Sequence, residues 1–249
     1  MAKDKDEVVV YWGPPYRTGS DHMIDWNMFY TDPEELLPDF KKDRIKEIRQ
    51  NSIAYCPAFN DNYKNTFIVR NVVDSKFTWN DQEKKWEIPT KYQVHPALDV
   101  RMPYMNNRMA IITSLVWLFV CEESLEMEII PPYMHQTEAS KYGVITSGKF
   151  DIGSWYRPIL AEYLLWEGVD RLQLKENEPL FYIRFNTDKK VVLKRFANTE
   201  EIYKHTVSIV QTKYIFGKLP ALDKLYNYFA RTQTKDIMLK KIKDAVIDK

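Results

Sequence analysis

Two short histidine–aspartate spacings contain the residue types needed for acid–base or metal chemistry. His22 and Asp25 are three residues apart in SDHMIDW, and His95 and Asp99 are four apart in HPALDVR. Either pair could ligate a metal ion or exchange a proton with a substrate. However, the sequence lacks the closely spaced histidines and carboxylates of zincins or non-haem iron sites. We therefore predict no bound metal and interpret both pairs as hydrogen-bonding and capping groups.

The usual sequence motifs of nucleotide binding and covalent catalysis are also absent. The chain has no Walker-type loop and no G-x-G-x-x-G, and its seven glycines leave little material for a backbone phosphate cradle. Cys56 precedes a proline, Cys121 ends an apolar run, and no G-x-S-x-G motif marks a catalytic serine. We therefore predict no cofactor and favour a binding function over an enzymatic one.

The densest group of aromatic and polar residues lies between Tyr11 and Tyr30, in YWGPPYRTGSDHMIDWNMFY. Aromatic residues together with arginine are typical of interface hot spots and of stacking on carbohydrates or bases. We therefore predict that this N-terminal arm carries binding residues, which are Trp12, Tyr16, Arg17, His22, Asp25 and Trp26. The alternative is that the arm only packs on the protein and closes the open side of a β-sandwich.

Composition and charge exclude several classes of protein. The 249 residues are 45% hydrophobic, which is enough for a large buried core. The 36 basic and 35 acidic residues give a net charge of +1, so no overall field attracts nucleic acid or a membrane surface. The two cysteines are too few for a disulfide scaffold and fit a reducing compartment.

The apolar segments fit neither a secretion signal nor a membrane span. The N-terminus, MAKDKDEVVVYWG, has only three valines between charged and aromatic residues, so we expect no signal peptide. The run from Met109 to Cys121 has 13 residues, fewer than the roughly 20 of a transmembrane helix. We predict a buried strand or strand pair there. Richness in lysine, isoleucine, asparagine and tyrosine suits an AT-rich genome such as many viruses have.

Short runs of β-branched and aromatic residues indicate strands between Ile53 and Phe185. FTWNDQEKKWEI predicts a hairpin in which Trp79 and Trp86 form a cross-strand pair. VDRLQLKENEPLFYIRF predicts a second hairpin, with its turn at 175–178. In this register three alternating residues enter the core, which are Phe181, Ile183 and Phe185. The opposite face is expected to be solvated and carries Leu180, Tyr182 and Arg184.

Helix signals lie on both sides of this strand region. Asp32 is a candidate N-cap with Pro33 at the first helical position, and Pro38 is predicted to split this helix in two. Towards the C-terminus, Asn198 and Glu201 resemble a capping box, and Gly217 marks a helix end.

Two amphipathic helices are predicted near the end of the chain. Their apolar stripes are Leu222, Leu225, Tyr226 and Phe229, followed by Met238, Ile242 and Ala245. Residues 189–249 contain 14 basic and 6 acidic residues, a net charge of +8. We interpret this charge as a solvated helix face.

These patterns together predict an α+β fold. Its core is expected to be an antiparallel β-sandwich or jelly-roll-like structure, with helices in the N- and C-terminal parts. Residues 1–196 would form the sandwich core with the N-terminal arm and a short helix. Residues 197–249 would form the C-terminal amphipathic helices packed on that core.

Three stretches carry a resemblance to other proteins. They are IAYCPAFNDNYKNTFIVRNVVDSKFTW, LFVCEESLEMEIIPPYMHQTEASKYGVITSGKFDIGSWYRPI and LKENEPLFYIRF. Their layout resembles little-characterised proteins of bacteria and phages known only as domains of unknown function. The resemblance covers the central half of the chain and is compatible with a β-sandwich or jelly-roll core. It implies no activity, cofactor or catalytic residue, but it favours a phage origin.

The sequence therefore predicts a non-enzymatic binding or assembly protein of viral, phage origin. Its expected partner is another protein or further copies of itself, without a membrane, in the host cytoplasm or the virion. The alternative is a jelly-roll enzyme whose pocket is built from scattered polar residues, among His22, Asp25, His95, Asp99, Arg101, His135 and Arg157. A third, less favoured function is contact of the C-terminal helices with nucleic acid.

Overall fold

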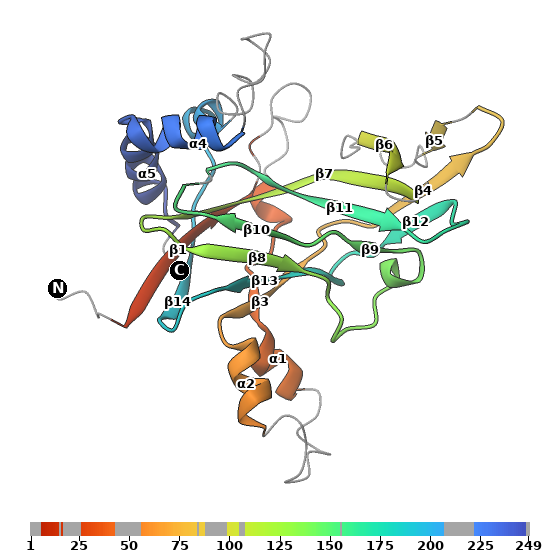
Figure 1. The fold of residues 1–249 in the computed structure, drawn as a ribbon, viewed down its shortest axis with the longest axis horizontal. Helices are drawn as coiled ribbons and strands as arrows, with labels where there is room; N and C mark the ends of the chain where they lie inside the picture. The colour runs from red at the N-terminus through yellow and green to blue at the C-terminus, as the bar shows by residue number, and fades with distance from the viewer. Residues whose placement is uncertain are drawn as a thin grey trace.

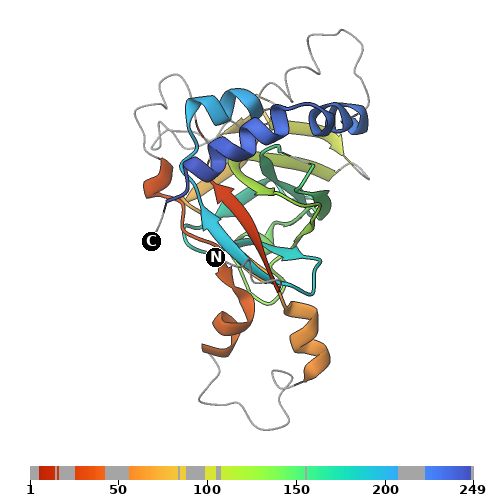
Figure 2. The ribbon, with the colours of Figure 1, turned by 90° about the vertical axis from the view of Figure 1, so that its left-hand side faces the viewer.

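The computed structural model describes residues 6–14, 16, 26–42, 56–83, 85–87, 99–104, 108–154, 156–206 and 222–247. Within these ranges the protein has an α+β fold with a sheet-rich core (Figure 1). Helices α1 (Leu36–Lys42) and α2 (Pro57–Tyr63) lie at one end of the molecule. Helices α4 (Leu222–Arg231) and α5 (Thr234–Asp244) lie at the other end (Figure 2).

The largest sheet in the described ranges has six strands in the order β14-β1-β7-β11-β9, with β6 also paired to β7. These strands are β1 (Glu7–Gly13), β6 (Asp99–Tyr104), β7 (Arg108–Cys121), β9 (Gly143–Ile145), β11 (Ile159–Leu165) and β14 (Lys190–Arg195). The apolar run predicted as a buried strand or strand pair is the single strand β7, 14 residues long. Because of its length, β7 pairs with β1, β6 and β11.

Two smaller sheets complete the core. A five-stranded sheet has the order β10-β8-β13-β3-β2, and a three-stranded sheet has the order β12-β4-β5. Their strands are β2 (Glu34–Glu35), β3 (Thr66–Arg70), β4 (Ser75–Asn80), β5 (Lys85–Glu87), β8 (Glu126–Ile130), β10 (Gly148–Asp151), β12 (Arg171–Leu174) and β13 (Pro179–Phe185). Two single 3-10 turns, Trp26–Met28 and Ala139–Lys141, lie between strands.

The prediction of an antiparallel core needs one correction, because β1 and β14 run parallel. The register pairs Glu7 with Lys190 and Trp12 with Arg195. Almost the whole chain separates these two strands, so no short hairpin forces them to run in opposite directions. The other strand pairs in the described ranges are antiparallel.

One large apolar cluster contains side chains from all three sheets. Trp117 of β7 packs edge-to-face on Phe181 of β13, with ring centroids 5.2 Å apart. Ile183 and Phe185 of β13 are buried in the same cluster, which confirms the predicted core face of this strand. The first predicted hairpin is also confirmed, since Trp79 pairs with Trp86 at a ring-centroid distance of 5.7 Å.

The second predicted hairpin is wrong, because β12 and β13 belong to different sheets. Leu172 of β12 pairs with Phe77 of β4, whereas β13 pairs with β3 and β8. The connecting turn is held by Asn71, whose C=O accepts from the N–H of Asn177 at 2.8 Å. The Asn71 side chain donates to the C=O of Lys175 at 3.0 Å. The chain therefore changes sheet at this turn instead of folding back on itself.

The predicted solvated face of β13 is also mostly wrong. Leu180 is 2% exposed and lies in the main cluster, next to a register shift between Pro179 and Phe181. Tyr182 is 0% exposed and packs in a small apolar cluster with Leu36, Tyr63 and Ile68. Helices α1 and α2 contribute to this cluster and so cover the face. Arg184 on the same face stays partly exposed, where it pairs with Glu128. The alternation of residues shows which side chains share a face but not which element covers that face.

The helix boundaries differ from the sequence prediction at two places. Glu34 pairs with Ile68 as part of β2, so α1 begins at Leu36 and not at Pro33. Pro38 does not split the helix, because it lies in the first turn, where its missing N–H is not needed. Later in the chain, residues 200–206 are helical. Thr199 caps that helix through the N–H of Ile202 at 3.3 Å, in place of Asn198.

The C-terminal helices bury part of their predicted apolar stripes, and the side chains of Leu222 and Leu225 lie outside the described residues. Phe229, Met238 and Ile242 form a cluster with Leu118 and Val120 of β7. Helix α5 therefore covers the side of β7 that faces away from the main cluster. None of the helices in the described ranges has the length and apolar character needed to span a membrane. The predicted helix end at Gly217 lies outside the described residues.

Replacing Ile183 with alanine should lower the free energy of unfolding by roughly 2–5 kcal/mol. The reason is that the side chain is fully buried. The neighbouring control Arg184→Ala should cost about 1 kcal/mol or less, because its ion pair with Glu128 is partly exposed. Urea denaturation followed by circular dichroism measures both. Equal costs would contradict the assignment of Ile183 to the core.

The basic C-terminal region should not bind duplex DNA strongly. Lys204, Lys241 and Lys243 each pair with a carboxylate of the same protein, on Glu200, Glu201 and Glu122 respectively. These pairs reduce the positive field that phosphates require. We expect a dissociation constant weaker than about 100 μM at about 0.15 M salt, measured by fluorescence anisotropy with a labelled duplex. Tighter binding that weakens steeply with salt would overturn this expectation.

Candidate functional site

The structure places only part of the predicted binding arm. Arg17, His22 and Asp25 lie outside the described residues, and the side chain of Trp26 is also outside them. Tyr16 contacts Tyr203, with ring centroids 5.6 Å apart. Trp12 is 1% exposed and packs in the main cluster.

The residues of the alternative enzyme pocket are not brought together in the described structure. His95 lies outside the described residues, and only the backbone of Asp99 and Arg101 is described, in β6. The guanidinium of Arg157 donates to the hydroxyl of Tyr226 at 3.4 Å. His135 instead contacts Tyr182 and Asp39. Among the described residues, no group of three or more potential ligands has the geometry to hold a metal ion.

A polar chain of three residues connects α1, the 131–135 loop and β13. His135 contacts the Tyr182 hydroxyl through Nδ1 and the Asp39 carboxylate through Nε2, at 3.2 Å for the latter. Arg70 also pairs with Asp39, at 3.4 Å. With Nε2 protonated, His135 donates to Asp39 and accepts from Tyr182. Burial raises the pKa of the Tyr182 phenol above its ordinary value.

This chain has the carboxylate–imidazole–hydroxyl order of a proton relay, but the hydroxyl cannot reach a substrate. Tyr182 has no exposed surface, so its oxygen is used within the protein. We therefore interpret the chain as a structural link that fixes α1 on β13. Sequence reasoning missed it because Asp39, His135 and Tyr182 are far apart in the chain and only the fold joins them.

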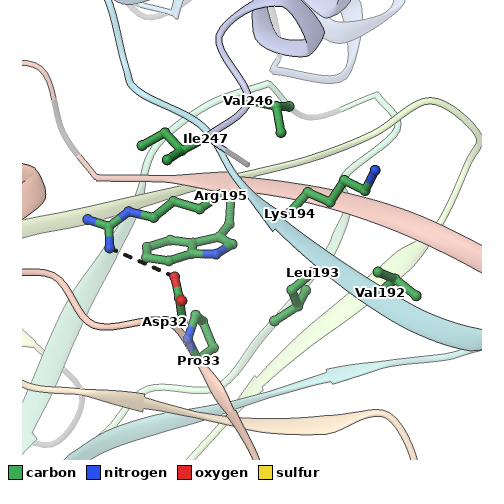
Figure 3. Close-up of a pocket in the computed structure, with 9 residues that line it drawn as sticks. Asp32, Pro33, Val192, Leu193, Lys194, Arg195, Val246 and Ile247 are labelled. Carbon is green, nitrogen blue, oxygen red and sulfur yellow. Dashed lines mark ion pairs between the residues drawn. The ribbon is translucent and has the colours of Figure 1, made fainter. Parts of the chain in front are cut away.

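A pocket of about 300 Å³ lies at one side of the core, beside the edge strand β14 (Figure 3). It opens between β14 and the segment that leads into β2. Strand β14 is an edge of the six-stranded sheet, and β2 is an edge of the five-stranded sheet. The lining is mainly apolar with a few charged groups and consists of Trp12, Asp32, Pro33, Val192, Leu193, Lys194, Arg195, Val246 and Ile247. Trp12, predicted from the sequence as a binding residue, therefore lines this pocket.

Arg195 fixes the polar side of the pocket. Its guanidinium lies 5.0 Å from the centre of the Trp12 ring, within cation–π range. It donates to the C=O of Tyr30 at 2.8 Å and to the C=O of Asn27 at 2.6 Å. Asp32 lies 3.8 Å from the same guanidinium. Arg195 thus fastens residues 27–32 to β14 and leaves an apolar floor between them.

The outer edge of β14 presents backbone groups next to this pocket. The N–H of Lys190 donates to the C=O of Asp6, directly before β1, and the N–H of Phe196 donates to the C=O of Trp12 in β1. Because backbone groups alternate along a strand, residues 191, 193 and 195 point theirs away from β1. We call residues 191–194 the edge window. In the described part of the chain, the N–H and C=O of Leu193 have no hydrogen-bond partner.

Both ends of the edge window are closed by other parts of the chain. At one end, the side-chain oxygen of Asn65 accepts from the N–H of Val191 at 3.1 Å. Asn65 has a positive φ of 54°, and its side chain also donates to the C=O groups of Thr187 and Lys189. At the other end, the N–H of Ile247 donates to the C=O of Arg195 at 2.9 Å. The free stretch is therefore short and centred on Leu193.

The buried tyrosine in the polar chain predicts a loss of stability at high pH. Burial raises the folded-state pKa of Tyr182 above the unfolded value of about 10. Its stabilisation is therefore complete below about pH 10 and is lost as the pH rises towards the folded-state pKa. We expect Tyr182→Phe to show a smaller fall in the free energy of unfolding between about pH 9 and 11 than the wild type, measured by urea denaturation.

The same variant at pH 7 separates ionisation from hydrogen bonding. There Tyr182→Phe should cost about 1–3 kcal/mol, because Nδ1 of His135 loses its partner. If the free energy of unfolding fell equally in both proteins at high pH, the folded structure would not be raising the pKa of the Tyr182 phenol.

Comparison with protein-family models, with curated proteins and with solved structures finds no match for this chain. The function is therefore inferred from the geometry of the pocket and the edge window.

Proposed function

We propose that this protein is a non-enzymatic binding protein that holds an extended segment of another protein against β14. The observation that carries the proposal is the edge window beside an apolar pocket. Backbone groups of Leu193 would pair with the bound segment, and the pocket would hold one of its side chains. In binding modules that accept an added strand, backbone hydrogen bonds provide affinity and side-chain pockets provide specificity.

The size of the window predicts a weak and reversible interaction. About three backbone hydrogen bonds fit between Asn65 and Ile247, each contributing about 0.5–1.5 kcal/mol. One apolar side chain in the pocket adds roughly 1.5–3 kcal/mol. Association also costs rotational and translational freedom. The favourable contributions reach at most about 7 kcal/mol and the association cost is about 4 kcal/mol or more, so the expected dissociation constant of an isolated segment is in the millimolar range.

A partner of different sequence is favoured over a second copy of the chain. Lys190 and Lys194 are exposed on β14, and lysines on an edge strand oppose pairing between identical edges. Two copies of β14 side by side would bring the Lys194 charges of both copies to the joined edge, whereas Lys190 is already paired with Glu7. We therefore narrow the predicted partner to another protein.

The finer fold description is also a proposal. Facing residues such as Trp117 and Phe181 join the two larger sheets through one cluster, and this supports a β-sandwich. A pocket at the open side between two sheet edges is compatible with that architecture. The phage origin and a location in the host cytoplasm or the virion stay predictions from the sequence.

Selection from a displayed library of random decapeptides tests the proposed function. Enriched peptides should bind the wild type, and the N–H of Leu193 should become protected from hydrogen exchange. The N–H of Val192 is an internal control, because it points towards β1 and should be protected already. Leu193→Pro should abolish binding, since it removes the outward N–H, and edge strands tolerate proline.

Two further variants make this test specific. Leu193→Val keeps the N–H and should retain binding. If both Leu193→Val and Leu193→Pro lose binding, the leucine side chain and not the backbone N–H would be responsible. Ile247→Asp changes a pocket residue that is 42% exposed and should weaken binding without unfolding the protein. Enriched peptides that bind Leu193→Pro as well as they bind the wild type would overturn the proposal.

A further inference from the structure

We propose that the bound segment runs antiparallel to β14 and carries an acidic residue immediately before an apolar residue. This inference rests on the proposed function, because it names the chemistry of the segment that the edge window would hold.

Antiparallel pairing suits the groups that the window offers. A single residue placed opposite Leu193 would exchange both backbone hydrogen bonds with it, and antiparallel pairs are slightly more stable per residue than parallel ones. The same edge already accepts an antiparallel neighbour, since Phe196 pairs with Val246 just beyond the window. The local twist of β14 therefore accommodates this direction.

The residue opposite Leu193 should be apolar. Directly opposed residues in an antiparallel pair place their side chains on the same face of the sheet. Leu193 points towards Asp32 and Pro33, on the pocket side of β14, whereas Lys194 points away from them (Figure 3). The incoming side chain would enter the pocket beside Leu193. The apolar floor, with Trp12 at its base, favours one large apolar side chain.

The residue opposite Lys194 should be acidic. Lys190 pairs with Glu7 at 3.1 Å, and Arg195 lies 3.8 Å from Asp32. Lys194 is exposed and has no ion pair within the described ranges of the chain. A carboxylate on the bound segment would supply its missing partner. Because the segment runs antiparallel, the residue opposite Lys194 directly precedes the residue opposite Leu193.

Three nine-residue peptides test this order of residues. GSTELTVSG has the proposed order, GSTLETVSG inverts it, and GSTKLTVSG replaces the acid by lysine. Titrations followed by NMR, at about 20 mM salt, should show that the first peptide binds about two- to fivefold more tightly than the others. The preference should shrink at about 300 mM salt, where exposed charges are screened.

Charge reversal on the protein identifies the contact. Lys194→Glu should invert the preference, so that GSTKLTVSG binds more tightly than GSTELTVSG. Lys240→Glu is the matched control, because it changes the net charge equally at an exposed position on α5. An equal effect of both variants would show a general charge effect and overturn the proposed contact.

The readout separates this inference from the proposed function. Peptides that protect the Leu193 N–H equally well, whatever their charge or order, would overturn the acidic–apolar order and leave the proposed function in place. If no peptide protects that N–H, including those enriched from the library, both fail. A variant lacking residues 248 and 249 tests whether the end of the chain itself occupies the edge window. Binding that appears only in that variant would make the chain itself the occupant of the window.

Discussion

Strand β7 is buried on both of its faces, and the described structure depends on this burial. Its alternating residues Ile111, Trp117 and Phe119 enter the main cluster, while Leu118 and Val120 enter the cluster under the C-terminal helices. A strand covered on both sides is mainly apolar, which explains the run in the sequence. The buried polar residue Thr113 donates its hydroxyl to the C=O of Ala161 in β11 at 3.4 Å. By pairing with β1, β6 and β11 it also fixes the sheet whose edge is β14.

Local patterns in the sequence predicted the local features of this fold. The alternation at Phe181 and Ile183 gave the correct core face of β13, and the two tryptophans Trp79 and Trp86 gave the correct hairpin. Both follow from the period of two residues along a strand, which needs no knowledge of the rest of the chain. Helical spacing likewise identified Phe229 and Met238 as buried positions.

The incorrect predictions concern contacts between distant segments. The burial of Tyr182 depends on α1 and α2, and the turn held by Asn71 sends β12 to another sheet. The candidate site is of the same kind, because Asn65 and Ile247 define the edge window from positions far from Leu193 in sequence. No spacing rule relates such residues, since only the folded backbone brings them to one edge. Trp12, a candidate binding residue from the aromatic density of its surroundings, lines the pocket, and its role in binding stays a prediction.

The described part of the aromatic N-terminal arm packs on the core. Tyr30 is buried and packs edge-to-face on Trp117 at 5.3 Å, so the arm closes part of the open side of the core. Arg195 holds the same segment against β14 through the C=O groups of Asn27 and Tyr30. The segment then continues into β2 of the other sheet. Asp32 and Pro33 of this segment line the pocket together with Leu193, so an apolar cavity and outward-facing backbone groups lie side by side at the edge window.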